Sequence, residues 1–136
     1  MIYLDSAAIV KLVRQEAYSA DLVSWLNAHA DVPLVSSALV EVEVPRALRR
    51  SAPQALIGVP ATVGRLFRLE IDSTIRATAA AYAEPTLRSL DAIHLATAQV
   101  LTNESGTTLI AFVTYDRRLL DNAKAAGLPT ASPGQD

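Results

Sequence analysis

Carboxylates at separate places along the chain could together carry metal-dependent chemistry at phosphorus. Asp5 and Asp116 each directly follow an apolar run that predicts a β-strand, and Asp91 falls in the first turn of a predicted helix. Open α/β sheets bind ligands beyond the carboxyl ends of their strands, so we expect Asp5 and Asp116 on one rim. Carboxylates that converge repel one another, which raises their pKa values or requires a cation between them. Mg²⁺, which takes oxygen ligands and can activate water toward phosphorus, is the natural partner.

A fourth acid comes from the helix predicted after the second strand. Glu41 and Glu43 lie about 200° apart on that helix, so only one of them can face the rim, and periodicity does not choose between them. Each acid also has an ordinary structural explanation. An Asp between a strand and a helix is a common N-cap, and the helix dipole favours an acid in a first turn. Glu43 could also pair with Arg46 on an exposed helix face.

Histidine, glycine and cysteine usage narrows the chemistry. His94 falls in the apolar segment 92–96, where we expect a packed imidazole that donates to a backbone carbonyl, and His29 falls in a predicted turn. With 5 Gly and no glycine-rich phosphate loop or nucleophile-elbow motif, the chain is unlike nucleotide-dependent enzymes. Its zero Cys excludes disulfides, thiolate metal sites and a cysteine nucleophile.

Composition predicts one globular domain. The chain has 136 residues, of which 51% are hydrophobic and 19% charged, and we expect a single domain over 1–136 with a frayed tail at 132–136. No apolar run approaches the roughly 20 residues that a membrane span needs. No basic segment precedes the apolar start, so no secretory signal is visible and we expect the cytoplasm. A net charge of −2 gives no basic field that would indicate nucleic acid.

Apolar runs alternate with amphipathic stretches, which is typical of strands and crossover helices in an α/β sheet. We expect strands at 2–4, 33–36, 68–71 and 109–115. We expect helices at 6–14, 19–26, 37–50, 73–83, 89–100 and 117–126, with a broken connection over 51–63.

Capping residues, glycine and proline predict where several of these helices begin, end or bend, and apolar spacing predicts which side packs inward. Ser19 is expected to cap the second helix, whose inward side is formed by residues 22, 23 and 26. Ser73 or Thr74 is expected to cap the Ala-rich helix, and Gly127 to follow the last helix as its C′ residue. Pro45 lacks an N–H group and should bend or weaken the helix over 37–50.

Four segments together resemble the PIN-domain ribonucleases, specifically the VapC-type toxins of bacterial toxin–antitoxin pairs. The segments are 2–8 (IYLDSAA), 36–48 (SSALVEVEVPRAL), 87–98 (LRSLDAIHLATA) and 112–119 (FVTYDRRL). In the second segment the spacing of Ser37, Glu43 and Arg46 matches the family motif, which selects Glu43 over Glu41. The third segment is nearly a signature of this toxin group. The stretch 82–87 is shorter than the usual pattern, which leaves the helix ends there open.

The resemblance implies a twisted, mainly parallel sheet flanked by helices in a single PIN-like domain. It also implies an acidic pocket that holds Mg²⁺ or Mn²⁺ and cleaves RNA endonucleolytically. In this interpretation Asp5 and Asp91 hold the metal, while Glu43 and Asp116 complete the pocket and position or deprotonate water without a covalent intermediate. The supporting hydroxyls are those of Ser6 and Thr114. Candidate phosphate contacts, or alternatively a solvated helix face, are Arg46, Arg49 and Arg50.

The resemblance further implies a homodimer and a cognate VapB-type antitoxin that blocks the pocket, often with a basic side chain among the carboxylates. Such a side chain would neutralise the repulsion that Mg²⁺ otherwise relieves, so antitoxin and metal should compete. Trp25 and the high apolar content fit either a partner surface or an ordinary core.

Three alternatives to the nuclease remain open at this stage. A haloacid-dehalogenase-type phosphatase would need a second Asp two residues after Asp5, where Ala7 stands. A phospho-acceptor domain would need an acceptor Asp after a third strand. A catalytically silent PIN-like module that only binds RNA or protein would often lose one of the four acids, and all four positions are filled.

Overall fold

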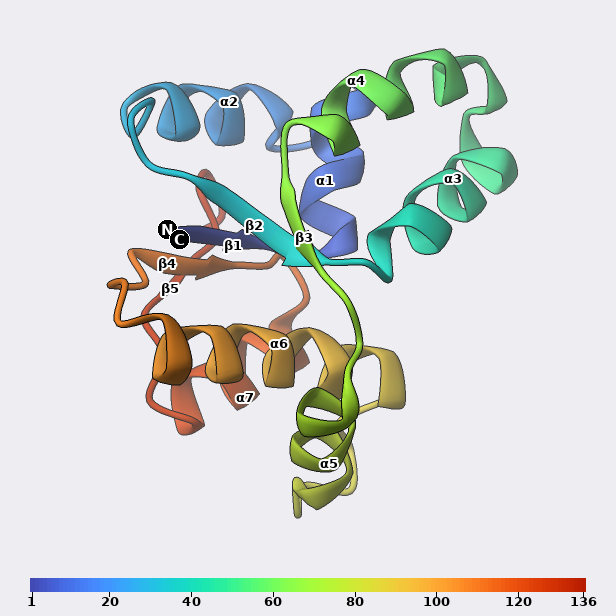
Figure 1. Ribbon diagram of the computed structural model, residues 1–136. Coiled ribbons are helices and arrows are strands. Elements are labelled where there is room, and N and C mark those ends of the chain that lie inside the picture. Colours follow the sequence, from blue (N-terminus) through green and yellow to red (C-terminus); the bar gives the residue numbers. More distant parts are fainter.

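A five-stranded sheet forms the centre of the computed structural model, which describes residues 1–136 (Figure 1). The strand order is β3-β2-β1-β4-β5, and every neighbouring pair is parallel. The strands are β1 (Ile2–Leu4), β2 (Leu34–Ser37), β3 (Phe67–Leu69), β4 (Ala111–Val113) and β5 (Thr130–Ala131). The predicted α/β class and mainly parallel sheet are confirmed.

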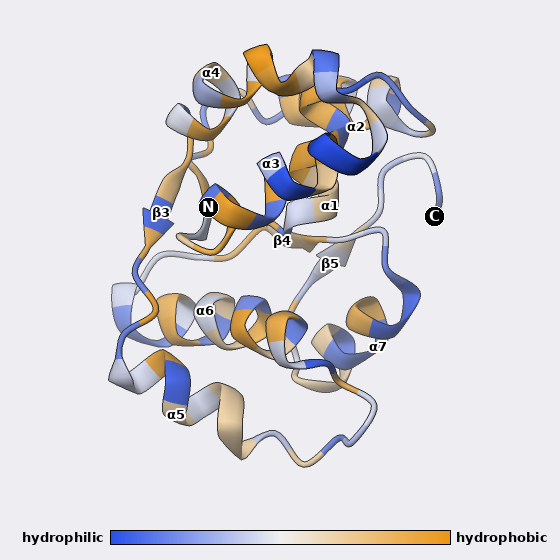
Figure 2. Cartoon of the chain, turned by 90° about the vertical axis from the view of Figure 1, so that its right-hand side faces the viewer, coloured by the Kyte–Doolittle hydropathy of each residue, from blue (hydrophilic) through white to orange (hydrophobic).

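Helices cover both faces of the sheet. One face carries α1 (Ser6–Val13), α2 (Ser19–Asn27), α3 (Val40–Ser51) and α4 (Val59–Gly64), and a 3₁₀ helix (Pro53–Gly58) joins the last two. The other face carries α5 (Ser73–Ala81), α6 (Ser89–Ser105) and α7 (Arg117–Ala125). Figure 2 shows hydrophobic and hydrophilic residues alternating along these helices, as expected where one side packs on the sheet. None of the seven α-helices combines the length and apolar character that a membrane crossing requires.

The central strand β1 is buried on both faces. Ile2 and Leu4 pack into a cluster with side chains of α1, α3 and α4, whereas Tyr3 packs into a second cluster with side chains of α6 and α7. This alternation is the two-residue period of a strand, and burial on both faces explains why β1 is apolar throughout. From β1 the chain adds β2 and β3 on one side of the sheet, and β4 and β5 on the other. At such a topological switch point, here between β1 and β4, the carboxyl ends of the strands border a crevice.

The C-terminal tail differs from its predicted frayed state. The two-residue strand β5 pairs with β4 at the sheet edge and is too short to give a sequence pattern. Beyond it, the Ser132 hydroxyl donates to the carbonyl of Thr114 at 2.6 Å, and the Tyr115 hydroxyl donates to the carbonyl of Pro133 at 2.8 Å. Ser132 and Pro133 are therefore buried, while the last three residues are exposed. These contacts join segments 18 residues apart, so local pattern does not reveal them.

Several predicted helix starts were also wrong in detail. Asp72, not Ser73 or Thr74, caps α5 by accepting from the backbone N–H of Ile75 at 2.9 Å. The N-cap of α2 is Tyr18, in the left-handed region with φ of 68°, and the buried Ser19 hydroxyl donates to the carbonyl of residue 14 instead.

Two other elements differ from expectation in extent or facing. Val23 of α2 was predicted inward but is 44% exposed. Pro45 lies inside α3, and the helix continues past it to Ser51. The helix begins only at Val40, because Ser36 and Ser37 belong to β2.

Candidate active site

A cavity of about 550 Å³ lies where β1 and β4 end, and it gathers the predicted site residues. The four predicted acids all line it, although they come from four different segments: Asp5 after β1, Glu43 on α3, Asp91 on α6 and Asp116 after β4. Ser6 lies in the same lining. The tertiary fold therefore brings together residues that are up to 111 positions apart in the sequence.

Asp5 serves both as a helix cap and as a wall of the cavity. Its Oδ1 accepts from the backbone N–H of Ala8 at 2.9 Å, which caps α1, while its Oδ2 accepts from the Thr114 hydroxyl at 2.5 Å. The residue is only 4% exposed. Burial raises the pKa of Asp5 above its ordinary value, although the two hydrogen bonds partly oppose this, and the negative charge of Asp91 adds to the rise.

Thr114 connects the ends of the two central strands. Its hydroxyl donates to Asp5 and accepts from the backbone N–H of Asp116 at 3.1 Å. Asp116 in turn caps α7, since its Oδ1 accepts from the backbone N–H of Leu119 at 2.9 Å. Asp5 and Asp116 thus each cap a helix and also line the cavity, since each carboxylate has two oxygens with different partners.

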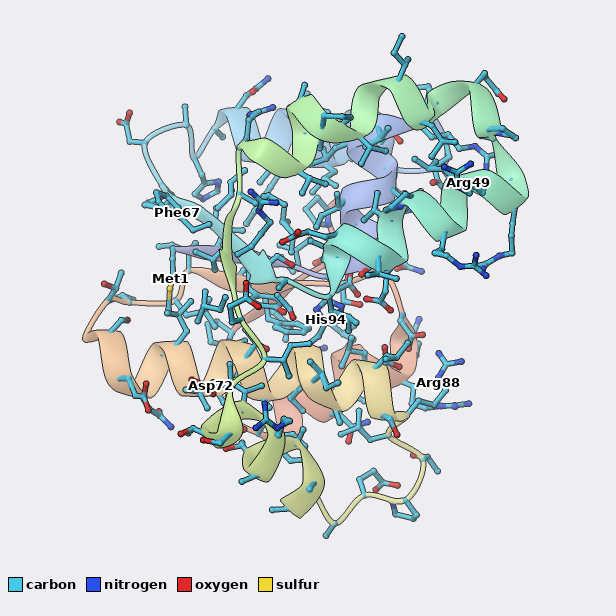
Figure 3. The ribbon with its side chains drawn as sticks, turned by 45° about the vertical axis from the view of Figure 1, so that its right-hand side comes forward. Met1, Arg49, Phe67, Asp72, Arg88 and His94 are labelled. Carbon is cyan, nitrogen blue, oxygen red and sulfur yellow. The ribbon has the colours of Figure 1, made fainter.

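Asp91 lies in the first turn of α6 and is half-buried on the cavity side. Burial raises the pKa of Asp91, and the neighbouring Asp116 carboxylate raises it further. Arg88 bridges these two acids: its Nε lies 3.4 Å from Asp91 Oδ2 and its Nη2 lies 3.2 Å from Asp116 Oδ2. Arg88 was not among the predicted site residues, although its spacing of three residues from Asp91 was a usable signal. Its side chain is 66% exposed (Figure 3).

Glu43, and not Glu41, faces the cavity. Glu41 lies 3.4 Å from Arg68, away from the cavity, while Oε1 of Glu43 accepts hydrogen bonds from the Ser6 hydroxyl and from His94 Nε2, the latter at 2.8 Å. Burial tends to raise the pKa of Glu43, but the hydrogen bonds from His94 and Ser6 outweigh it, and the pKa is lowered. The exposed pair between Glu43 and Arg46 that the sequence allowed is not formed.

The expectation for His94 was wrong. Its ring does not donate to a backbone carbonyl but lies between the Tyr3 hydroxyl, 2.7 Å from Nδ1, and Glu43. The side chain is 2% exposed and lines the deep part of the cavity. Figure 3 shows His94 between α6 and α3, with Arg88 at the nearby start of α6. Asp91 and His94 are three residues apart, so they lie on one face of α6. This spacing could have indicated that His94 lines the same cavity as Asp91.

The three predicted arginines separate into two groups. Arg46 and Arg50 are four residues apart on α3 and both line the cavity. Arg49, offset by about 100° from Arg50 around the helix, is exposed outside the lining (Figure 3).

The donor set fits a hard divalent cation. The side chains form no ready-made group of three or more His, Asp and Glu that could hold a metal ion. Mg²⁺, however, favours one or two protein carboxylates together with waters and substrate oxygens. The buried Asp5 and the half-buried Asp91 both have raised pKa values, partly through repulsion between carboxylates, and a cation between them would relieve that repulsion.

The parallel sheet and its acidic cavity point to a known class of protein. A family model described as PIN domain matches residues 2–125, and the chain belongs to this PIN-domain family.

Within the family the chain is of VapC type. It is 52% identical over 135 residues to Ribonuclease VapC35 of Mycobacterium tuberculosis, which covers 99% of this chain and 98% of the relative. It is 41% identical over 132 residues to Ribonuclease VapC46 of the same species, which covers 97% of both chains. The predicted family is therefore confirmed.

A solved structure has the same fold. The crystal structure of VapC20 of Mycobacterium tuberculosis, described as a sarcin–ricin loop cleaving toxin, superimposes with a TM-score of 0.71 over 98% of this chain and 100% of that one. The two sequences are only 15% identical, so the likeness supports the fold alone.

Proposed function

We propose that this protein is the toxin of a VapBC-type toxin–antitoxin system and acts as a Mg²⁺-dependent endoribonuclease. The observation that carries the proposal is the convergence of four carboxylates from four separate segments in one cavity. The similarity to proteins named ribonucleases supports RNA as the substrate.

Asp5 and Asp91 are the proposed metal ligands, with Mn²⁺ as a possible substitute for Mg²⁺. When bound, the ion would polarise the scissile phosphate and activate water for attack at phosphorus. Thr114 holds the Asp5 carboxylate in one orientation through its hydroxyl. The two short helices that begin beside the cavity, α1 and α7, are capped by Asp5 and Asp116, so these acids are fixed to rigid elements.

Glu43 is the proposed water-positioning group. Ser6 and His94 both donate to its Oε1, which leaves Oε2 to orient the attacking water or accept its proton. The hydrogen bonds lower the pKa of Glu43, so its carboxylate is ionised at neutral pH and can orient the water by accepting a hydrogen bond from it. Asp116 completes the acidic wall, and the reaction requires no covalent intermediate.

RNA contacts are proposed for Arg46 and Arg50, whose side chains line the cavity beside the acids. A guanidinium binds phosphate bidentately and would offset the repulsion between RNA and the four carboxylates. Arg49 lies outside the lining and would contact RNA only beyond the cavity mouth.

A VapB-type antitoxin is the proposed partner, and a homodimer is the proposed assembly. A basic antitoxin side chain placed among the four carboxylates would compete with the metal. RNA and antitoxin would both be met in the cytoplasm.

The test is a cleavage assay on purified protein with RNA and Mg²⁺, with Asp5→Asn and Asp91→Asn as variants. Asp121→Asn, an exposed acid on α7 outside the cavity, is the matched control. We expect cleavage by the wild type and the control, its loss in chelator, and a loss of at least about 100-fold in both cavity variants. If RNA binds but is not cut by any of the proteins under any metal condition, the silent-module interpretation replaces this proposal.

A further inference from the structure

A buried polar chain runs from the middle of the sheet to the candidate active site. Tyr3 lies on the central strand β1, His94 on α6 and Glu43 on α3. Figure 1 shows α6 below the sheet and α3 above it. The three side chains are joined by two contacts, from the Tyr3 hydroxyl to His94 Nδ1 at 2.7 Å and from His94 Nε2 to Glu43 at 2.8 Å. We propose that Tyr3 and His94 form a positioning pair that holds the Glu43 carboxylate in its catalytic orientation.

Core packing alone does not require these side chains. His94 interrupts an otherwise apolar stretch of α6, and both it and Tyr3 are almost completely buried. A buried imidazole costs free energy unless both ring nitrogens are hydrogen-bonded, whereas an apolar side chain of similar volume would fill the space without that cost. Both nitrogens are hydrogen-bonded here: Nδ1 contacts the Tyr3 hydroxyl, and Nε2 contacts Glu43 and, at 3.2 Å, the Ser6 hydroxyl, which are both residues of the proposed site.

The partners define the tautomer of the imidazole. A phenol keeps its proton at neutral pH, so the Tyr3 hydroxyl, 2.7 Å from Nδ1, can donate to it. An ionised carboxylate only accepts hydrogen bonds, so the proton between His94 and Glu43 comes from Nε2. With its proton on Nε2, the ring donates to Glu43 and leaves Nδ1 to accept from the Tyr3 hydroxyl.

Tyr3 is itself held rigidly. Its ring stacks on Phe112 of the neighbouring strand β4, with centroids 5.1 Å apart and planes 3° from parallel. Its contact with the His94 ring is edge-on, at 5.8 Å and 77°. Since the phenol is fixed by the sheet, the imidazole is fixed in turn, and so is the Oε1 atom that it binds.

The consequence for catalysis concerns the second carboxylate oxygen of Glu43. Ser6 and His94 both donate to Oε1, so rotation of the carboxylate would break two hydrogen bonds at once. Oε2 takes part in neither of these hydrogen bonds, and Glu43 lines the cavity, where the proposed function needs a group to orient water. The inference rests on that proposed function, but its structural half, the His94 tautomer, can be measured without any RNA.

The first measurement is ¹⁵N NMR of the histidine rings in the metal-free full-length protein. The chain has 2 His, so a His29→Gln variant assigns the signals. We expect the His94 ring to carry its proton on Nε2 at neutral pH, and we expect Tyr3→Phe to remove the hydrogen-bond shift at Nδ1. A ring protonated on Nδ1 alone, or one unaffected by Tyr3→Phe, would overturn the proposal whether or not the protein cleaves RNA.

The second measurement is the kinetics of RNA cleavage with saturating Mg²⁺. His94→Leu removes the donor to Glu43, and we expect kcat to fall by about 10- to 100-fold with KM changed by less than about threefold, because supporting hydrogen bonds typically have effects of this size. His94→Gln keeps a donor near the position of Nε2 and should recover at least about tenfold of the loss. Tyr3→Phe should lower kcat by less than His94→Leu does.

Non-additivity separates a positioning pair from two independent core residues. Because Tyr3 acts only through His94, the double variant Tyr3→Phe/His94→Leu should have the same kcat as His94→Leu alone. Urea unfolding of every variant shows whether the fold is kept. A wild-type kcat in His94→Leu, or a double variant with multiplied effects, would contradict the proposal. If His94→Leu does not fold, His94→Gln and its double variant with Tyr3→Phe decide by the same comparison.

Discussion

Replacing Thr114 by Val tests how the structure holds its most buried acid. Thr114 is fully buried, and its hydroxyl makes two hydrogen bonds, one donated to the Asp5 carboxylate and one accepted from the backbone N–H of Asp116. Valine has nearly the same shape but no hydroxyl, so the substitution removes both bonds while it keeps the packing.

The magnitude follows from the chemistry of the two bonds. A hydrogen bond to a charged group contributes about 1.5–3 kcal/mol to stability, and one between neutral groups about 1 kcal/mol. We therefore expect Thr114→Val to lower the free energy of unfolding by about 2–4 kcal/mol at neutral pH. Asp5 would also be free to turn, so the affinity for Mn²⁺ should fall by about 10- to 100-fold.

The effect on stability should depend on pH. Burial raises the pKa of Asp5, and a carboxyl with a raised folded-state pKa favours folding at low pH and loses that contribution as pH rises through the folded-state value. The Thr114 hydroxyl lowers this pKa, so its removal raises it further. The deficit of the variant should accordingly be smaller at acidic pH, where more of Asp5 is protonated, and should grow as pH rises.

The assay is urea denaturation of the metal-free protein at pH 7 and near pH 4. Thr102→Val is the matched control, because the Thr102 hydroxyl donates to a neutral carbonyl on α6 at 2.7 Å, far from the acids. We expect the control to change stability by less than about 1 kcal/mol, equally at both pH values. A deficit for Thr114→Val below that of the control, or one that does not change with pH, would refute the reasoning.

Three further predictions concern single side chains around the cavity. Arg88→Gln should raise the Mn²⁺ affinity of the RNA-free protein by about three- to tenfold in calorimetry, because the guanidinium competes for two carboxylates through exposed ion pairs. Unchanged affinity would contradict this. Glu43→Gln should lower kcat by at least about 100-fold, whereas Glu41→Gln, whose partner is on β3, should cleave RNA like the wild type; equal losses would reject this assignment. Arg46→Gln should weaken RNA binding and reduce its salt dependence in filter-binding assays, and Arg49→Gln should do so less, because Arg46 lines the cavity and Arg49 does not.

The parts of the fold that were predictable are those in which local pattern and tertiary role coincide. Strand β1 is apolar because both of its faces are covered, and its Asp follows at once because the same residue caps the next helix. The same holds for β4 and Asp116, although β4 is shorter than its apolar run. At these places one short segment contains the strand, the turn and the acid, so the sequence alone indicates all three.

The parts that were missed depend on contacts between distant segments. The tail after β5 is held by hydroxyls that meet carbonyls 18 residues away. His94 was interpreted from its apolar neighbours, but its role is defined by Tyr3 and Glu43, which lie 91 and 51 residues away. The local sequence around His94 does not predict that α3 and α6 come together at this end of the sheet.

The resemblance to a family supplied what periodicity left open. Spacing on α3 could not choose between Glu41 and Glu43, whereas the match to the second motif selected Glu43, and the structure places that residue in the cavity. The family resemblance did not identify Arg88 as a site residue. Arg88 lies within the matched third motif, yet only the geometry reveals that it bridges Asp91 and Asp116.

The most direct test of the central claim is to map RNA 5′ ends across the transcriptome of bacteria that briefly express the protein. Asp5→Asn and Asp91→Asn would be expressed at the same level beside the wild type. We predict discrete new RNA ends and arrested growth with the wild type alone. The same ends and the same growth in all three cultures would contradict the claim that this acidic cavity cleaves RNA.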